Sequence, residues 1–214
     1  MKNYNKSLEE LIGITIPGLD LGSPCTLPSF EEVQMWKEYG NRQLIVTEYV
    51  TEMILIYAKM IIEWNKEDKD VPIEKRKPIK ILLYSYGGDL DICNAFYNII
   101  LISKTPIYIF NMGICASAGA IIFLSGHKRY ALPGSRFLIH EGEIGLQGQS
   151  TKVIENLDNI KKTEKELEEF ILSRTKIDKK LYNRNKKKEW WINCQEAVEL
   201  GLVDAVVDDM DMLY

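Results

Sequence analysis

Two successive segments with the same order of strand, small-residue turn and helix constrain the fold of this chain more than any other feature. In the first, an apolar strand pattern at residues 79–84 leads to Gly87-Gly88 and then to a helix. In the second, the apolar stretch 106–110 leads to the small residues of 113–119 and a short helix. Such alternation is typical of parallel strands joined by right-handed crossovers. The chain is therefore expected to have an α/β fold.

Further elements are expected on both sides of these units. Apolar periodicity predicts a strand at 43–50, a helix at 51–64, short strands at 129–132 and 136–140, a helix at 196–200 and a last strand at 202–207.

A long helix is predicted between residues 150 and 176. Its apolar residues form a narrow stripe, and Lys162/Glu166 and Lys165/Glu169 stand four residues apart on the other side, where ion pairs support a helix. A helix of this length with so narrow a stripe is expected to project from the domain and to pack against something else, such as another subunit.

The length and the apolar content favour a single domain. The chain has 214 residues, of which 46% are apolar, enough to bury one core. Residues 1–40 hold a high density of glycines and prolines, which predicts a peripheral N-terminal arm or loop-rich extension. Residues 41–214 are expected to form the domain, so one functional site is sought there.

Composition excludes several classes of function. A net charge of -4 argues against nucleic acid as a partner, because binding phosphates needs a surplus of clustered basic residues. The four cysteines have neither CxxC pairing nor metal-ligand spacing, so we expect reduced thiols, no metal site and no cofactor. No apolar run is long enough to span a membrane, and the N-terminus does not resemble a signal peptide. A cytoplasmic protein is expected.

Only two histidines could serve as a general base. His127 lies in a polar turn, which favours an exposed loop residue. His140 ends the apolar strand 136–140, and such strand ends often carry catalytic groups in α/β proteins. On this feature alone, a structural histidine bonded to a nearby carbonyl is equally compatible.

Ser117 is the candidate nucleophile. It stands among small residues just before a helix, whose unpaired amides favour a developing negative charge. The small residues could instead only permit close helix packing. A serine hydroxyl needs an adjacent base, and His140 is the best candidate. Gly87-Gly88 could turn main-chain amides inward as an oxyanion hole requires, although a glycine pair is also a common tight connection.

Five ordered motifs over about residues 41–208 resemble the proteolytic subunit of the Clp protease. They are Ser85-Tyr-Gly-Gly88, Ala116-Ser-Ala-Gly-Ala120, Ser135-Arg-Phe-Leu-Ile-His140, Leu146-Gln-Gly-Gln-Ser150 and Gln195-Glu-Ala-Val-Glu-Leu-Gly-Leu-Val-Asp204. The resemblance implies a crotonase-like (ClpP-like) fold of stacked strand-turn-helix units with a projecting handle helix, here 150–176.

The resemblance also implies residue roles and partners. Ser117 is the implied nucleophile, His140 the base, and the amides of Gly87 or Gly88 and of Ala118 the oxyanion hole. Glu189 takes the place of the family's third triad residue, an aspartate, counted back from Trp191. Two stacked seven-membered rings, an ATP-driven AAA+ unfoldase and unfolded polypeptide substrates are implied as well.

Several positions depart from the family's pattern. Tyr86 replaces a proline, and Glu141-Gly-Glu143 replaces the usual Gln-Pro, so cleavage preference is expected to differ. The basic run 186–188 replaces a mixed-charge segment, and a solvated surface is the favoured interpretation.

Three functions are compatible with these observations. The leading hypothesis is a serine endopeptidase acting through an acyl-enzyme. An inactive paralogue that only builds a mixed ring is the second, because Glu189 carries an extra methylene. An acyl-CoA enzyme of the crotonase type, with Ser117 and His140 incidental, is the third.

Overall fold

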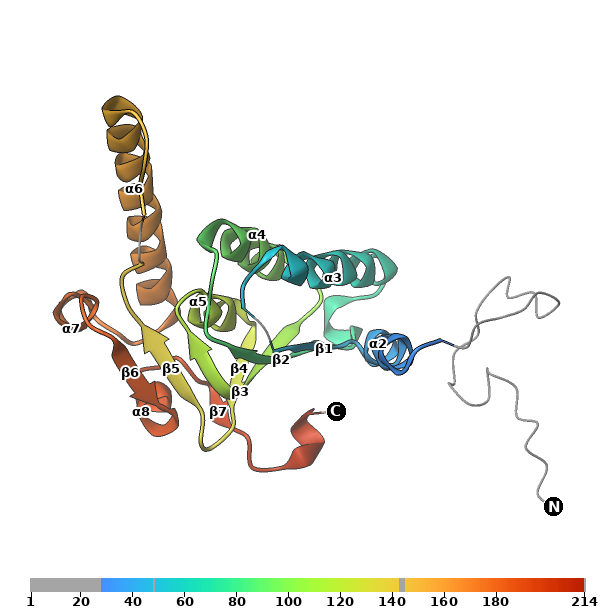
Figure 1. Cartoon of the computed structure of the whole chain (residues 1–214). Coiled ribbons are helices and arrows are strands. Elements are labelled where there is room, and N and C mark those ends of the chain that lie inside the picture. The colour runs from blue at the N-terminus through green and yellow to red at the C-terminus, as the bar shows by residue number, and fades with distance from the viewer. Residues whose placement is uncertain (1–27, 48, 143–144, 214) are drawn as a thin grey trace, which may run out of the picture.

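The computed structural model describes residues 28–47, 49–142 and 145–213. A seven-stranded sheet forms the centre, with strand order β1-β2-β3-β4-β7, and β5 pairs with β3 and β6 (Figure 1). The strands are β1 (Gln43–Val46), β2 (Ile79–Ser85), β3 (Ile107–Ala116), β4 (Lys128–Ala131), β5 (Arg136–Ile139), β6 (Trp190–Asn193) and β7 (Ala205–Val206). All pairs are parallel except β5 with β6, which confirms the α/β expectation.

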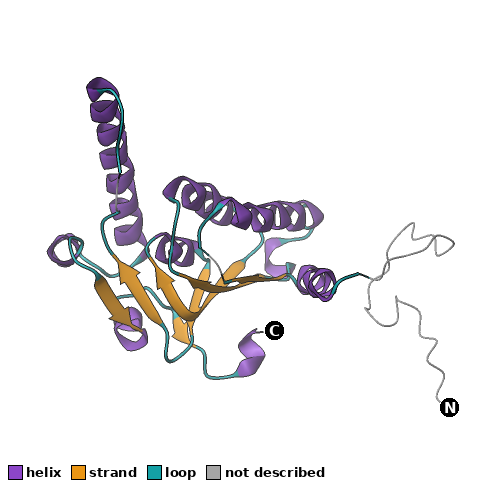
Figure 2. Cartoon of the chain, in the orientation of Figure 1, coloured by secondary structure: helices purple, strands orange, loops and turns teal. Residues whose placement is uncertain are grey.

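Helices α3 (Leu55–Glu67), α4 (Leu90–Ile102) and α5 (Ala118–Ser125) cover one face of the sheet (Figure 2). Their apolar residues and those of the strands form the main core, which includes Trp64, Phe96 and Phe123. The opposite face carries a smaller cluster around Leu82 and Phe110, over which the 3-10 helix η3 (Met210–Leu213) packs.

The thiols that the structure describes are buried in this core. Cys93, Cys115 and Cys194 are free and buried. Burial raises the pKa of Cys93 to about 12, so this thiol stays protonated and unreactive near neutral pH. The cysteines of the described ranges therefore act as small apolar residues.

Strand β3 is longer than predicted. The turn expected at 113–119 is wrong for most of its length, because the chain stays extended through Ala116 and turns only at Ser117. Two neighbours hold this second half: Ser85 of β2 pairs with Cys115, and Leu138 of β5 pairs with Ala116. The small residues serve close packing, since a Cβ on Gly119 would lie 3.0 Å from the Ser85 carbonyl oxygen.

A helix occupies part of the segment expected to be loop-rich. Helix α2 (Phe30–Asn41) begins with a capping box between Ser29 and Glu32, and the Tyr39 ring lies 5.2 Å from that of Trp64. Residues 30–40 of this segment are therefore helical and not loop-rich, and residues 1–27 lie outside the described ranges. The boundary at residue 41 stays a prediction.

The long helix α6 (Ser150–Arg174) projects from the domain as predicted (Figure 1). Its buried residues, Leu167 and Ile171, lie near its C-terminal end, whereas Ile154 is 60% exposed. Phe170 stacks on Tyr97 of α4 at 5.1 Å and anchors the base. The outer turns are therefore free to meet another surface.

Helices α7 (Lys179–Asn185) and α8 (Cys194–Glu199) follow α6 along the chain. Helix α7 and strand β6 were not predicted.

An ion pair stabilises the region where α2 and α3 end. The Arg42 guanidinium donates to both Asp68 oxygens, at 2.6 and 2.9 Å, and the Thr105 hydroxyl donates to Asp68 at 2.8 Å. The Arg42 side chain is only 14% exposed, and the Asp68 side chain only 8%. The hydrogen bonds from Arg42 hold the pKa of Asp68 below its usual 3.8.

Replacing Asp68 by Asn is expected to lower the free energy of unfolding by about 3 kcal/mol at neutral pH, because it leaves Arg42 without its counter-ion. Since the folded-state pKa is lowered, the stabilisation is present above 3.8 and is lost as pH falls through the folded value. Urea unfolding at fixed protomer concentration, at about pH 7 and about pH 3, checks this. Equal differences between wild type and variant at both pH values would contradict it.

Candidate active site

Ser117 occupies the turn between β3 and α5, in a backbone conformation that is rare for a residue with a side chain. Its φ and ψ are 53° and -124°. Its amide donates to the Leu138 carbonyl at 2.9 Å, and its carbonyl accepts from Ala120 in the first turn of α5. A strained residue at a strand-to-helix turn is typical of functional sites and holds the side chain at the edge of the sheet.

His140 follows β5 directly, beside the end of β3. In the parallel register, Ala116 lies opposite Leu138, so Ser117 and His140 leave neighbouring strands at the same edge. The structure therefore brings these two predicted residues to one place. Within the described ranges no hydrogen bond joins the Ser117 hydroxyl to the imidazole, and the buried Nε2 atom of His140 has no hydrogen-bond partner.

Glu189 directly precedes β6, and His140 directly follows β5, the antiparallel partner of β6. The described register ends with Ile139 paired to Trp190, so both residues lie just beyond it. The Glu189 carboxylate is exposed and accepts instead from the Trp191 indole N–H at 3.3 Å. Glu189 and His140 thus leave the same end of this strand pair, and within the described ranges no hydrogen bond joins their side chains.

The two glycines after β2 lie against the Ser117 turn. A Cβ on Gly87 would lie 2.8 Å from the Ser117 Cβ and 3.0 Å from the Ala118 nitrogen. Gly88 forms a parallel bridge with Val50, in which Val50 bonds to the Gly87 carbonyl and the Asp89 amide. The Gly88 amide therefore points to the side opposite Val50.

Of the three predicted oxyanion donors, Gly88 and Ala118 are the better-placed candidates. The Gly87 amide already donates to the Ser85 hydroxyl at 3.1 Å. Ala118 begins α5, where first-turn amides have no partner inside the helix. Its close approach to Gly87 brings both candidate donors to the same turn.

Lys186 differs from the sequence expectation for the run 186–188. Its ammonium lies 3.2 Å from Glu168 of α6 and 3.7 Å from Glu141, and its side chain is 25% exposed. Its carbonyl accepts from the Glu141 amide at 2.9 Å. The solvated-surface interpretation is therefore wrong for Lys186, which ties the segment after His140 to the base of α6. Lys187 and Lys188 are exposed as expected.

His127 has a structural contact instead of a catalytic one. Its Nδ1 atom accepts from the Ile107 amide at 2.8 Å, at the start of β3. Burial and the nearby Arg174 lower its pKa, which favours the neutral ring that this contact needs. It lies at the amino end of β3, away from Ser117.

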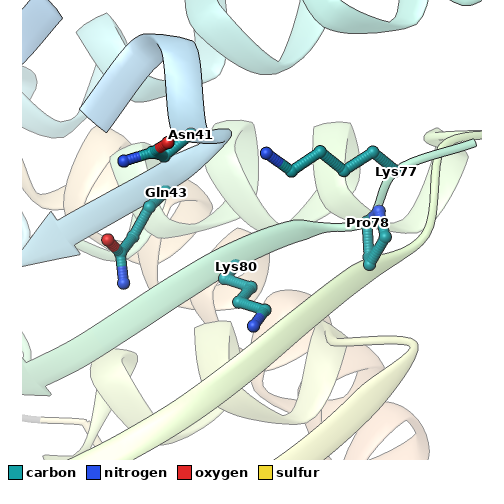
Figure 3. A pocket seen from close by; sticks show the side chains of 5 residues that line it. All are labelled: Asn41, Gln43, Lys77, Pro78 and Lys80. Atoms are coloured by element: carbon teal, nitrogen blue, oxygen red, sulfur yellow. The ribbon is translucent and has the colours of Figure 1, made fainter. Parts of the chain in front are cut away.

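A surface pocket of about 480 Å³ also lies away from Ser117. Its lining residues are Asn41, Gln43, Lys77, Pro78 and Lys80, at the amino ends of β1 and β2 (Figure 3). Gln43 donates to the Leu213 carbonyl and Lys80 to that of Met212, so these side chains hold the C-terminal segment. This pocket is at the sheet edge opposite the carboxyl ends.

Within the described ranges, no group of histidine, cysteine and acidic residues could hold a metal ion. No described helix is both long and apolar enough to cross a membrane.

Sequence reasoning singled out Tyr86 beside the glycine turn but missed two tyrosines that accompany it. The rings of Tyr49 and Tyr84 both contact that of Tyr86. The signal available in the sequence was the presence of Tyr84 and Tyr86 two residues apart, which places both on one face of β2 and its extension. Nothing local in the sequence links Tyr49 to them.

Comparison with known proteins points to one family. Residues 51–210 match the family described as Clp protease. The chain is 33% identical over 181 residues to the "ATP-dependent Clp protease proteolytic subunit 2" of Treponema denticola, covering 82% of this chain and 86% of that protein. The "ATP-dependent Clp protease proteolytic subunit" of Paracoccus denitrificans is 29% identical over 176 residues, covering 81% and 85%.

A solved structure has the same fold. A point mutant of ClpP1 from Listeria monocytogenes superposes with a TM-score of 0.72 at 20% sequence identity, covering 85% of this chain and 99% of that one. The expected ClpP-like fold is therefore confirmed.

Proposed function

The chain belongs to the Clp protease family and is a serine-type peptidase, and from this premise we propose that Ser117 is its nucleophile and His140 its general base. The Ser117 Oγ attacks the scissile carbonyl while His140 takes its proton and then returns it to the leaving amine. The resulting acyl-enzyme is hydrolysed by water with His140 again acting as base. The amides of Gly88 and Ala118 stabilise the oxyanion.

The observation that carries this proposal is the pairing of β3 with β5. It places a strained serine and a histidine at one sheet edge, beside a glycine turn that abuts the serine. Glu189, which leaves the same end of the β5–β6 pair as His140, is the proposed residue that orients the imidazole. This role requires its carboxylate to leave Trp191 and His140 to approach Ser117, and we propose that assembly induces both changes.

The family and its solved relative support self-assembly and an unfoldase partner in general. We propose seven-membered rings stacked as a tetradecamer, with α6 forming the contact between rings, fed by an AAA+ unfoldase with unfolded polypeptides. The exposed outer turns of α6 support this arrangement, since Ile154 and Leu157 would be covered by it. A cytoplasmic location is part of the proposal and agrees with the free, buried thiols.

The test is covalent labelling of the assembled protein by a fluorophosphonate, followed by peptide mapping. We expect modification at Ser117 and none in Ser117→Ala. A folded, assembled wild type that is never labelled, with or without an unfoldase, contradicts the nucleophile assignment.

A second function is favoured by one observation, the hydrogen bond of Glu189 to Trp191 in place of His140. It is a structural subunit that contributes to a mixed ring without hydrolysing peptides. Peptidase activity of the purified homo-oligomer, absent in Ser117→Ala, would exclude it. The match to the protease family over residues 51–210 favours either of these functions over an acyl-CoA enzyme.

A further inference from the structure

Three tyrosines form an exposed aromatic group next to the proposed active site. The Tyr86 ring lies 5.9 Å from Tyr84 in an edge-to-face arrangement and 6.2 Å from Tyr49. The Tyr84 and Tyr86 hydroxyls are 3.4 Å apart. Tyr49 and Tyr86 are 63% and 49% exposed. We refer to Tyr49, Tyr84 and Tyr86 as the tyrosine cluster.

Tyr84 anchors this cluster to the sheet. It lies on the face of β2 opposite the helices, because Leu83 and Ser85 on either side of it are buried toward them. It packs against Ile114, Ala116 and Leu138. A Cβ on Gly113 would lie 3.2 Å from its ring, so this glycine makes room for it.

The two exposed rings flank the proposed oxyanion turn. Tyr86 immediately precedes Gly87, which abuts Ser117. Tyr49 immediately precedes Val50. The Val50 amide donates to the Gly87 carbonyl, and the Val50 carbonyl accepts from the Asp89 amide. Both side chains therefore extend from residues next to backbone that is hydrogen-bonded beside the Ser117 turn.

Aromatic rings at this place have a use in peptide hydrolysis. We take the Gly88 and Ala118 amides to hold the carbonyl of the scissile bond. The substrate side chains on either side of that bond then lie about one residue away from it, roughly 3.4 Å along the substrate chain. Exposed tyrosines offer apolar faces with edge and stacking contacts for aromatic or large apolar groups. A cluster of them beside a reacting serine therefore favours such substrate side chains.

We propose that the tyrosine cluster binds an aromatic or large apolar side chain of the polypeptide substrate beside the scissile bond, with Tyr86 as the main specificity-determining residue. The inference rests on the proposed function, since it takes Ser117 as the nucleophile. It goes beyond that function in assigning cleavage preference to particular residues of this chain.

The experiment compares matched quenched-fluorescence peptides that carry Phe, Leu or Ala in turn on each side of the scissile bond. In wild type we expect Phe to give the highest kcat/KM on at least one side. Tyr86→Ala should lower kcat/KM for that Phe peptide about tenfold, mainly through KM, and change it less than about twofold for the Ala peptide, as expected for loss of one apolar contact. Tyr86→Phe should keep the preference.

Phe30→Ala is the matched control, because Phe30 is 78% exposed on α2 and lies outside the tyrosine cluster. If Tyr86→Ala fails to assemble, Tyr49→Ala tests the same point and should also weaken the preference for Phe. The proposal is overturned if an assembled variant keeps the wild-type ratio of kcat/KM for the Phe peptide to kcat/KM for the Ala peptide. It is also overturned if the tyrosine cluster is buried between subunits, where substrate could not reach it. Fluorophosphonate labelling of Ser117 in each variant separates these outcomes from failure of the proposed function, which would abolish labelling already in wild type.

Discussion

Replacing His140 by Ala is expected to lower kcat for peptide hydrolysis by about 10⁴- to 10⁶-fold, the range seen when a base of a serine triad is removed. Without the imidazole, the attack loses the group that we propose to accept the hydroxyl proton. Steady-state hydrolysis of a quenched peptide by the assembled protein measures the loss. Fluorophosphonate labelling should slow in parallel.

The other histidine provides a matched control. His127→Ala removes an acceptor of the Ile107 amide and should cost about 1 kcal/mol of stability, with little effect on kcat. If His127→Ala and His140→Ala lose activity equally, the loss comes from folding. If His140→Ala alone keeps most of its activity, His140 is not the base.

The strands and helices near the active site could be predicted because they depend on local patterns. The strands of 79–84 and 136–140 and the alternation with helices follow from short apolar runs bounded by glycine or polar residues. Parallel strands present their carboxyl ends at one edge, and Ser117 and His140 each follow a strand. Which strands pair was not predicted; the observed pairing of Ala116 with Leu138 brings the two residues to one edge.

The end of β3 was predicted wrongly because one set of residues serves two purposes. Small residues from Gly113 to Ala116 signal a turn, yet here they allow an extended strand to lie between β2 and β5 beneath α5. Only the tertiary neighbours decide between these uses. Helix α2, by contrast, had a local signal, the Ser29 and Glu32 capping box, which the glycines and prolines before it obscured.

The partners of Glu189 and Lys186 could not be predicted from sequence. The position of Glu189 at the same strand end as His140 depends on the antiparallel pairing of β5 with β6, a short strand beside a charged run. The contact of Lys186 with Glu168 joins residues 18 apart through the base of α6. Such contacts follow from how elements pack, and local periodicity carries no information about them.

Replacing Gly87 by Ala is expected to lower both stability and activity. The φ of Gly87 is +95°, which residues with a Cβ rarely adopt, and the added methyl would meet the Ala116 carbonyl oxygen at 2.7 Å and the Ser117 Cβ at 2.8 Å. Backbone strain and overpacking together should cost about 2–5 kcal/mol. Any relaxation that relieves the clash must move the Ser117 turn, where the Ala118 amide is the proposed oxyanion donor. Loss of one such donor alone lowers kcat by at least about 100-fold.

The control is Gly134→Ala, because a Cβ at Gly134 meets nothing within 4 Å and its φ lies outside the positive range. It should leave peptide hydrolysis and the melting temperature close to those of wild type. Thermal unfolding and kcat, measured on the assembled fraction of each variant, separate the effect of Gly87→Ala on stability from its effect on activity. If assembled Gly87→Ala hydrolyses peptides as fast as Gly134→Ala, the close approach of Gly87 to Ser117 has no part in positioning the nucleophile or the oxyanion donors.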